Sequence, residues 1–91
     1  MTSNWKIKFS EVAKKNIENL DKETARRIIK FLLDRLSTLE NPRSIGEALK
    51  GSKLGDFWRY RVGDYRIIAS IQDLEFSVLV VKIGHRKEIY R

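Results

Sequence analysis

The 91-residue sequence contains no cysteine, one histidine and one proline. Without cysteine, a disulfide framework, a thiolate zinc site and a cysteine nucleophile are all excluded. Histidine-based metal sites use two or three of these side chains, so a single histidine argues against one. We therefore expect no metal and no cofactor. The lack of cysteine also agrees with a reducing compartment such as the cytoplasm.

Long apolar runs are missing as well. The longest apolar stretches, Ile28–Leu33 and Phe76–Val81, are far shorter than the ~20 residues that cross a membrane. Charged residues recur too often in residues 1–15 to leave the apolar core of a signal peptide. We therefore expect a cytoplasmic protein with no membrane partner.

Acidic residues are in deficit relative to basic ones. The chain has 19 Lys and Arg against 12 Asp and Glu, a net charge of +7. The excess is spread along the chain, with ten basic and six acidic residues in 1–46 and nine and six in 47–91. A basic surface attracts polyanions, above all nucleic acid. The simpler alternative is that the charge only keeps a small domain dispersed.

The length allows one domain, residues 1–91, with a core too small for a large enclosed cavity. Trp5–Phe9 alternates apolar and polar residues, which predicts a half-buried strand. Ser10 and Asp21 are helix-capping residues, and each precedes an apolar stripe. The second stripe has strong helical periodicity and ends before Pro42. It consists of Ala25, Ile28, Ile29, Leu32, Leu33, Leu36 and Leu39.

From Phe57 onward the apolar period changes to two. Three strands are predicted, over 57–62, 65–71 and 76–83. Gly63-Asp64 predicts a tight hairpin, and 72–75 a second turn. Residues 40–56 are expected to be a loop with one amphipathic turn. The predicted fold is α+β: an N-terminal strand, a two-helix hairpin and a three-stranded antiparallel meander.

The two-residue hairpin loop fixes which side chains share a face. Val62 is expected opposite Tyr65, and Arg61 opposite Arg66, with the pairing continuing along both strands. One face is apolar and is expected to lie under the helices. It carries Trp58, Tyr60, Val62, Tyr65, Ile67, Ala69 and Ile71. We expect Trp58, like Trp5, to serve the core rather than to stack on bases.

The opposite face of the hairpin carries Arg59, Arg61 and Arg66. Like charges placed side by side destabilise a sheet, and residues 57–71 supply no acid on this face. A bound phosphate would explain the cluster, because guanidinium groups match phosphate geometry. Two alternatives are pairing with acids from elsewhere and simple solvation. The acids considered are Glu47, Asp56 and Glu88.

The C-terminal segment adds His85, Arg86 and Tyr90. His85 can exchange protons near neutral pH, although a lone histidine often only packs or faces solvent. Tyr90 could act as a base only if cationic neighbours lowered its pKa from the ordinary ~10. Arginines of the hairpin could supply that environment.

Two segments carry a resemblance to a known family. Residues 58–68 read WRYRVGDYRII and residues 80–90 read VVKIGHRKEIY. Together with Asn41-Pro42-Arg43, Gly46 and residues 48–51, they resemble the RelE/ParE toxin superfamily, and within it the RelE branch. The resemblance extends over nearly the whole chain, and its C-terminal half is the specific part.

The resemblance implies the RelE-like microbial ribonuclease fold and a toxin held inactive by a cognate, RelB-like antitoxin. RelE-type toxins enter the A site of the small ribosomal subunit, cut messenger RNA there without a metal, and inhibit translation. The 2′-hydroxyl of the message attacks the adjacent phosphate, which leaves a 2′,3′-cyclic phosphate and a free 5′-hydroxyl.

The resemblance also implies roles for individual residues. Arg59 and Arg61 match basic positions that are often lysine in the family, and Arg66, Arg86 and Tyr90 match the others. These groups stabilise the phosphorane, protonate the leaving oxygen and activate the 2′-hydroxyl. Tyr90 is the implied base.

His85 remains an alternative base, or the acid. Two other functions stay open at this point. One is a ParE-like inhibitor that binds DNA gyrase without cutting, and the other is a plain RNA-binding module. An antitoxin helix is expected on the exposed flank of the long helix, near Phe31 and Arg35.

Overall fold

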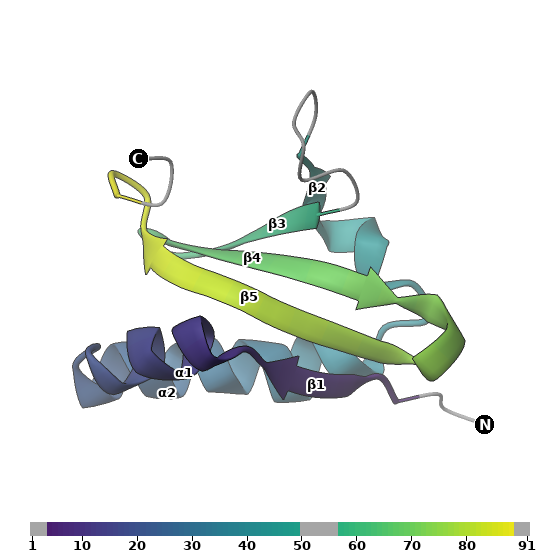
Figure 1. Cartoon of the computed structure of the whole chain (residues 1–91), viewed down its shortest axis with the longest axis horizontal. Coiled ribbons are helices and arrows are strands. Elements are labelled where there is room, and N and C mark those ends of the chain that lie inside the picture. The colour runs from purple at the N-terminus through teal and green to yellow at the C-terminus, as the bar shows by residue number, and fades with distance from the viewer. Residues whose placement is uncertain (1–3, 50–56, 89–91) are drawn as a thin grey trace.

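The computed structural model describes residues 4–49 and 57–88. One twisted sheet lies over a pair of helices (Figure 1). The helical elements are α1 (Glu11–Glu18), α2 (Lys22–Lys30), the π-helical turn η1 (Phe31–Arg35) and the 3-10 turns η2 (Leu36–Thr38), η3 (Pro42–Ile45) and η4 (Asp73–Glu75). The strands are β1 (Lys6–Phe9), β2 (Glu47–Ala48), β3 (Phe57–Val62), β4 (Tyr65–Gln72) and β5 (Ser77–His85).

The sheet has five strands in the order β1-β5-β4-β3-β2. The antiparallel meander β3-β4-β5 confirms the prediction, as do the α+β class and the order of elements. β1 adds parallel to β5, with Lys6 aligned to Ser77 and Phe9 to Val80. The prediction of a loop with one amphipathic turn over residues 40–56 is wrong in part: η3 is a turn within that segment, but β2 also forms there and pairs with β3.

Both predicted helix caps are present. The Ser10 hydroxyl accepts a hydrogen bond from the Ala13 N–H and donates one of 2.7 Å to the Val81 carbonyl. The Asp21 carboxylate accepts from the Thr24 N–H. Hydrogen bonding by Thr24, first through its side chain and then through its backbone, lowers the pKa of Asp21 below its ordinary value. Ser10 therefore both starts α1 and fastens it to β5.

The long apolar stripe does not form one uniform α-helix. α2 ends at Lys30 and continues as a π-helical turn and then a 3-10 turn. Ile28, Leu32 and Leu36 are fully buried, whereas Leu33 is 51% exposed. The periodicity placed Leu33 in the buried stripe, and this was wrong because the ordered core uses the row spaced four residues apart.

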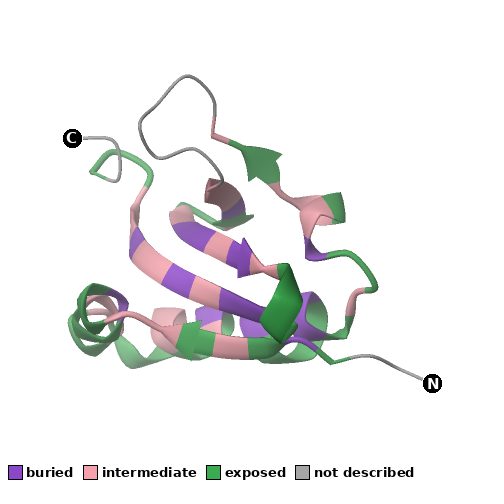
Figure 2. Ribbon diagram, turned by 45° about the vertical axis from the view of Figure 1, so that its right-hand side comes forward, coloured by how far each residue is buried: buried purple, intermediate pink, exposed green. Residues whose placement is uncertain are grey.

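The core lies between the helices and the sheet. Tyr60, Ile67 and Ala69 point into it from the hairpin, and Val78 and Val80 from β5. Burial alternates along parts of the strands, as Figure 2 shows, but Ile67, Ile68 and Ala69 of β4 are buried in succession, where the register between β4 and β5 shifts. Trp5 is buried and Trp58 packs against the core, so both tryptophans take the predicted structural role.

Candidate functional site

The hairpin register places the three arginines on one face as predicted. Arg61 is aligned with Arg66, Arg59 with Ile68 and Val62 with Tyr65. Gly63 has a φ of 58° in the connecting turn, a backbone conformation that glycine adopts without strain. The tight turn therefore sets the position of every side chain on this face.

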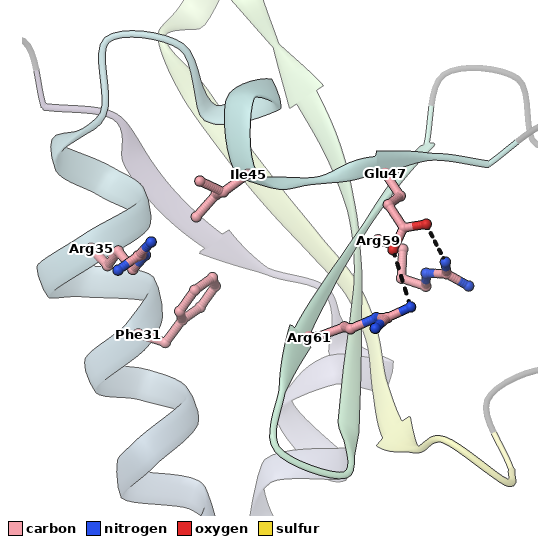
Figure 3. A pocket seen from close by; sticks show the side chains of 6 residues that line it. All are labelled: Phe31, Arg35, Ile45, Glu47, Arg59 and Arg61. Carbon is pink, nitrogen blue, oxygen red and sulfur yellow. Dashed lines mark hydrogen bonds and ion pairs between the residues drawn. The ribbon is translucent and has the colours of Figure 1, made fainter.

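An acid from outside the hairpin joins two of these arginines. The Glu47 carboxylate of β2 lies 2.7 Å from a guanidinium nitrogen of Arg59 and 3.5 Å from one of Arg61 (Figure 3). β2 pairs with β3 so that Glu47 stands directly opposite Arg59. Of the three acids considered from the sequence, Glu47 is the one that makes this contact. Asp56 lies outside the described residues, and Glu88 forms no ion pair within residues 4–49 and 57–88.

A groove of about 470 Å³ opens beside this ion pair. Arg35 and Phe31 line it from the π-helical turn, and Ile45 lines it from η3 (Figure 3). Arg59, Arg61 and Glu47 complete its wall. The groove thus combines three guanidinium groups, one carboxylate and an aromatic ring. From the sequence, Phe31 and Arg35 were expected to flank an antitoxin helix, which stays a prediction; the structure brings them to the same groove as Arg59 and Arg61.

Arg66 is held at the hairpin turn. One guanidinium nitrogen donates to the Gly63 and Tyr65 carbonyls, both at 3.0 Å. It therefore stands apart from the Glu47 ion pair while sharing its sheet face. The other guanidinium nitrogens have no hydrogen bond within the described part of the chain.

His85 lies on the opposite face from Arg66. Gly84 is aligned with Arg66, and the next residue, His85, is aligned with Tyr65, so the alternation turns its side chain toward the helices. The two rings meet edge to face with centroids 5.6 Å apart. His85 Nδ1 accepts the Lys87 N–H at 3.2 Å, which assigns the proton of a neutral ring to Nε2. The structure does not bring His85 together with the arginine cluster.

Arg86 leaves β5 beside the hairpin turn. Its backbone N–H donates to the Asp64 carbonyl at 2.8 Å, which fixes the start of the C-terminal segment next to the turn that carries Arg66. The Arg86 side chain is exposed. Tyr90 lies outside the described residues, so its role stays a prediction.

A buried tyrosine supports the site from below. The Tyr60 hydroxyl donates to the Pro42 carbonyl at 2.6 Å, and burial raises the pKa of Tyr60 to about 12. Arg43 in the same turn makes a two-pronged contact with Asp73 at 3.0 and 2.7 Å. Its guanidinium also lies 5.9 Å from the centre of the Trp58 ring. These contacts hold η3, and with it Ile45, in place.

Residues 4–49 and 57–88 contain no cluster of three His, Cys, Asp or Glu side chains that could hold a metal ion. Within the same residues, no helix is long and apolar enough to cross a membrane.

The sequence of this chain matches a known protein family. A family model described as the ParE toxin of type II toxin–antitoxin systems, parDE, matches residues 7–90. The chain is 26% identical over 87 residues to Toxin RelG of Mycobacterium tuberculosis. That match covers 96% of this chain and 97% of the relative.

Solved structures show the same fold. The toxin–antitoxin complex RelBE2 of Mycobacterium tuberculosis contains a chain with a TM-score of 0.83 and 22% identity, covering 97% of this chain and 98% of that one. The archaeal RelE–RelB complex of Pyrococcus horikoshii OT3 gives a TM-score of 0.73 at 28% identity, covering 93% and 98%.

Proposed function

We propose a function from one established premise, that the chain belongs to the ParE toxin family of type II toxin–antitoxin systems, within the RelE/ParE toxin superfamily. The proposed activity is cleavage of messenger RNA in the A site of the ribosome, which stops translation. The proposed partners are the message on the small subunit and a RelB-like antitoxin. Because both proposed partners are cytoplasmic, the proposed location of the protein is the cytoplasm.

The observation that carries this proposal is the pair of arginines bridged by one carboxylate. Glu47 contacts Arg59 and Arg61 at 2.7 and 3.5 Å, so the two guanidinium groups are spaced to grip a single small anion from two sides. A phosphate group has the same charge sign and more acceptor oxygens than a carboxylate. A phosphodiester of the message can therefore take the place that Glu47 fills in the free protein.

Cleavage at that phosphate needs no group beyond the chain and the message. The ribose 2′-oxygen forms a bond to phosphorus, its proton passes to a base, and the bond from phosphorus to the 5′-oxygen breaks. The leaving oxygen takes up a proton, which gives a 2′,3′-cyclic phosphate and a 5′-hydroxyl. Arg59 and Arg61 stabilise the extra negative charge that develops on the phosphorane oxygens.

The other residues predicted for the site have different proposed roles in this reaction. Arg66 and Arg86 both contact the hairpin turn, Arg66 through its guanidinium and Arg86 through its backbone N–H. Their proposed role is to supply further positive charge or the proton for the leaving oxygen. Tyr90 is the proposed base. His85 fits that role poorly as placed, because it faces Tyr65 on the other side of the sheet.

The test is primer extension on a defined message in a purified translation system, with and without ribosomes. Cuts within A-site codons that appear only with ribosomes are expected. Cuts in naked RNA would keep the nuclease and remove the ribosome as an obligatory partner. Intact message with normal translation would contradict the proposal.

A second candidate is inhibition of DNA gyrase by binding. The observation in its favour is the description of the matching family model, which names the ParE toxin. A supercoiling assay separates the two functions. Trapped or inactive gyrase together with intact message would favour this candidate, and the arginine pair would then need another role.

A further inference from the structure

The groove beside Glu47 continues along the open edge of β3. β2 pairs only with Trp58 and Arg59, so within the described residues the edge at residues 60–62 has no strand neighbour on that side. A second hollow of about 700 Å³ adjoins the first and shares Phe31 and Arg35 with it. Its remaining lining residues are Arg27, Lys30, Asp34, Thr38, Leu39 and Val62.

Positive charge dominates this continuous surface. The acidic side chains of this surface are Asp34 and Glu47. The basic side chains outnumber them and are Arg27, Lys30, Arg35, Arg59 and Arg61. No ion pair engages Arg27, Lys30 or Arg35 within residues 4–49 and 57–88.

These cations reach from the helix to the hairpin. A guanidinium nitrogen of Arg27 lies 3.3 Å from the point where a Cβ on Gly63 would stand. Arg35 lies at the other end, where the two hollows meet. A shallow channel thus runs between cations of the helix on one side and cations of the hairpin on the other.

An aromatic ring lies in this channel. Phe31 lines both hollows and is only partly buried. Its inner side is supported by Tyr60, whose ring centroid is 6.1 Å away at an angle of 54°. A supported ring between cations is the arrangement with which proteins hold single-stranded nucleic acid, because bases stack on the ring and phosphates meet the cations.

We propose that this channel binds single-stranded RNA, with one base against Phe31 and the adjacent phosphates on Arg35 and Arg61. The channel extends the cleavage site and rests on the proposed function, because the same strand passes from the Arg59–Arg61 pair into it. An acidic protein segment is the competing occupant. The excess of cations over carboxylates beside a stacking ring favours a polyanion with flat bases.

The experiment measures the affinity of the full chain for a fluorescein-labelled RNA of about twelve nucleotides, a length within the range of single-strand binding sites. The ribose carries 2′-fluoro groups, so the attacking hydroxyl is absent and the strand stays intact. Anisotropy is recorded over a range of salt concentrations. Arg35→Ala and Phe31→Leu test the channel. Arg26→Ala is the matched control, because Arg26 lies on the same helix and lines a different hollow with Ile29 and Leu33.

Arg35→Ala is expected to weaken binding about three- to tenfold and to lower the slope of log affinity against log salt by about 0.7, the value for one lost phosphate contact on a single strand. Phe31→Leu, which keeps apolar volume but removes the ring face, is expected to weaken binding about tenfold with the slope unchanged. Arg26→Ala is expected to bind as the unchanged chain. Thermal melting confirms that each variant is folded.

Three results would contradict RNA binding in the channel. These are no RNA binding by the unchanged chain at low salt, equal loss of affinity in Arg35→Ala and Arg26→Ala, and unchanged affinity in both Arg35→Ala and Phe31→Leu, which would leave the surface to an acidic protein segment. The same measurements distinguish a failure of RNA binding in the channel from a failure of the proposed cleavage activity. Message cleavage combined with an Arg35-independent affinity removes only the channel, whereas Arg35-dependent binding without any cleavage removes only the nuclease.

Discussion

The hydroxyl of Tyr60 donates a 2.6 Å hydrogen bond to the carbonyl of Pro42. The two residues lie on β3 and on the η3 turn, and both are buried. The bond joins the strand that carries Arg59 and Arg61 to the turn that leads into Glu47. The geometry of the ion pair thus depends on a contact in the core below it.

Tyr60→Phe removes this bond and leaves the Pro42 carbonyl buried without its partner. We expect a loss of about 1–3 kcal/mol in the free energy of unfolding, the usual range for a buried group left unsatisfied. Urea denaturation measures it. Tyr65→Phe is the control, because the Tyr65 hydroxyl makes no hydrogen bond within the described residues, and equal losses in both variants would refute the argument.

Gly46→Ala is expected to destabilise the protein through a collision. A Cβ at Gly46 would lie 2.8 Å from Tyr60 Cε1 and 3.1 Å from its Cζ. Overpacking of this kind costs about 1–3 kcal/mol. Ser44→Ala, in the exposed part of the same turn, should change the thermal midpoint little; a Gly46→Ala protein as stable as the parent would show that the turn moves freely.

Glu47→Gln is expected to tighten RNA binding. The substitution removes the carboxylate that competes with phosphate for Arg59 and Arg61. Partly exposed ion pairs are worth ~0.2–1 kcal/mol, so the gain in affinity should be about 1.5- to 5-fold. Anisotropy at fixed salt measures it, with Glu40→Gln as the matched control; weaker binding would mean that Glu47 instead positions the arginines.

Arg66→Ala and Arg86→Ala are expected to abolish growth arrest and to slow message cleavage about a hundredfold or more, the usual cost of removing a donor to developing negative charge. Lys15→Ala, an exposed cation of α1, controls for lost charge. Circular dichroism verifies folding. Full cleavage by both folded arginine variants would remove these two residues from the site.

The pairs Arg43–Asp73 and Lys8–Glu75 predict a dependence of stability on acid. The hydrogen bond from Arg43 lowers the pKa of Asp73 below its ordinary 3.8, and the one from Lys8 lowers the pKa of Glu75 below 4.5. A carboxylate with a lowered pKa stabilises the fold above its ordinary pKa, and the contribution disappears as the pH falls through the folded value. The melting temperature should therefore fall as the pH drops below about 4.

Asp73→Asn tests this prediction, because its melting temperature should fall less steeply with decreasing pH than that of the parent protein. Asp34→Asn, whose carboxylate forms no ion pair within the described residues, should follow the parent. Identical curves for Asp73→Asn and the parent would show that the contact with Arg43 carries no stability.

The hairpin could be predicted because its turn depends on residues that are adjacent in the sequence. Gly63-Asp64 leaves one register for the strands around it, so the alignment of Arg61 with Arg66 followed from the sequence. The caps at Ser10 and Asp21 were predictable for the same reason, since each acts within three residues.

Contacts over longer distances could not be read from local patterns. β2 is two residues long, too short for any periodicity, so the position of Glu47 opposite Arg59 had to come from the structure. From the sequence, Phe31 and Arg35 could be named only as the flank of a partner helix. That they lie in a π-helical turn and line the same groove as Arg59 and Arg61 had to come from the structure.

The parallel pairing of β1 with β5 sets an order of events during synthesis. A ribosome releases the N-terminal strand first, but its neighbour in the sheet begins only at Ser77. Val78 and Val80, which fill the centre of the core, arrive equally late. A nascent chain therefore carries both helices and the β3-β4 hairpin before it has the strand that closes the sheet, and the core between them can form only after Val80 has been made.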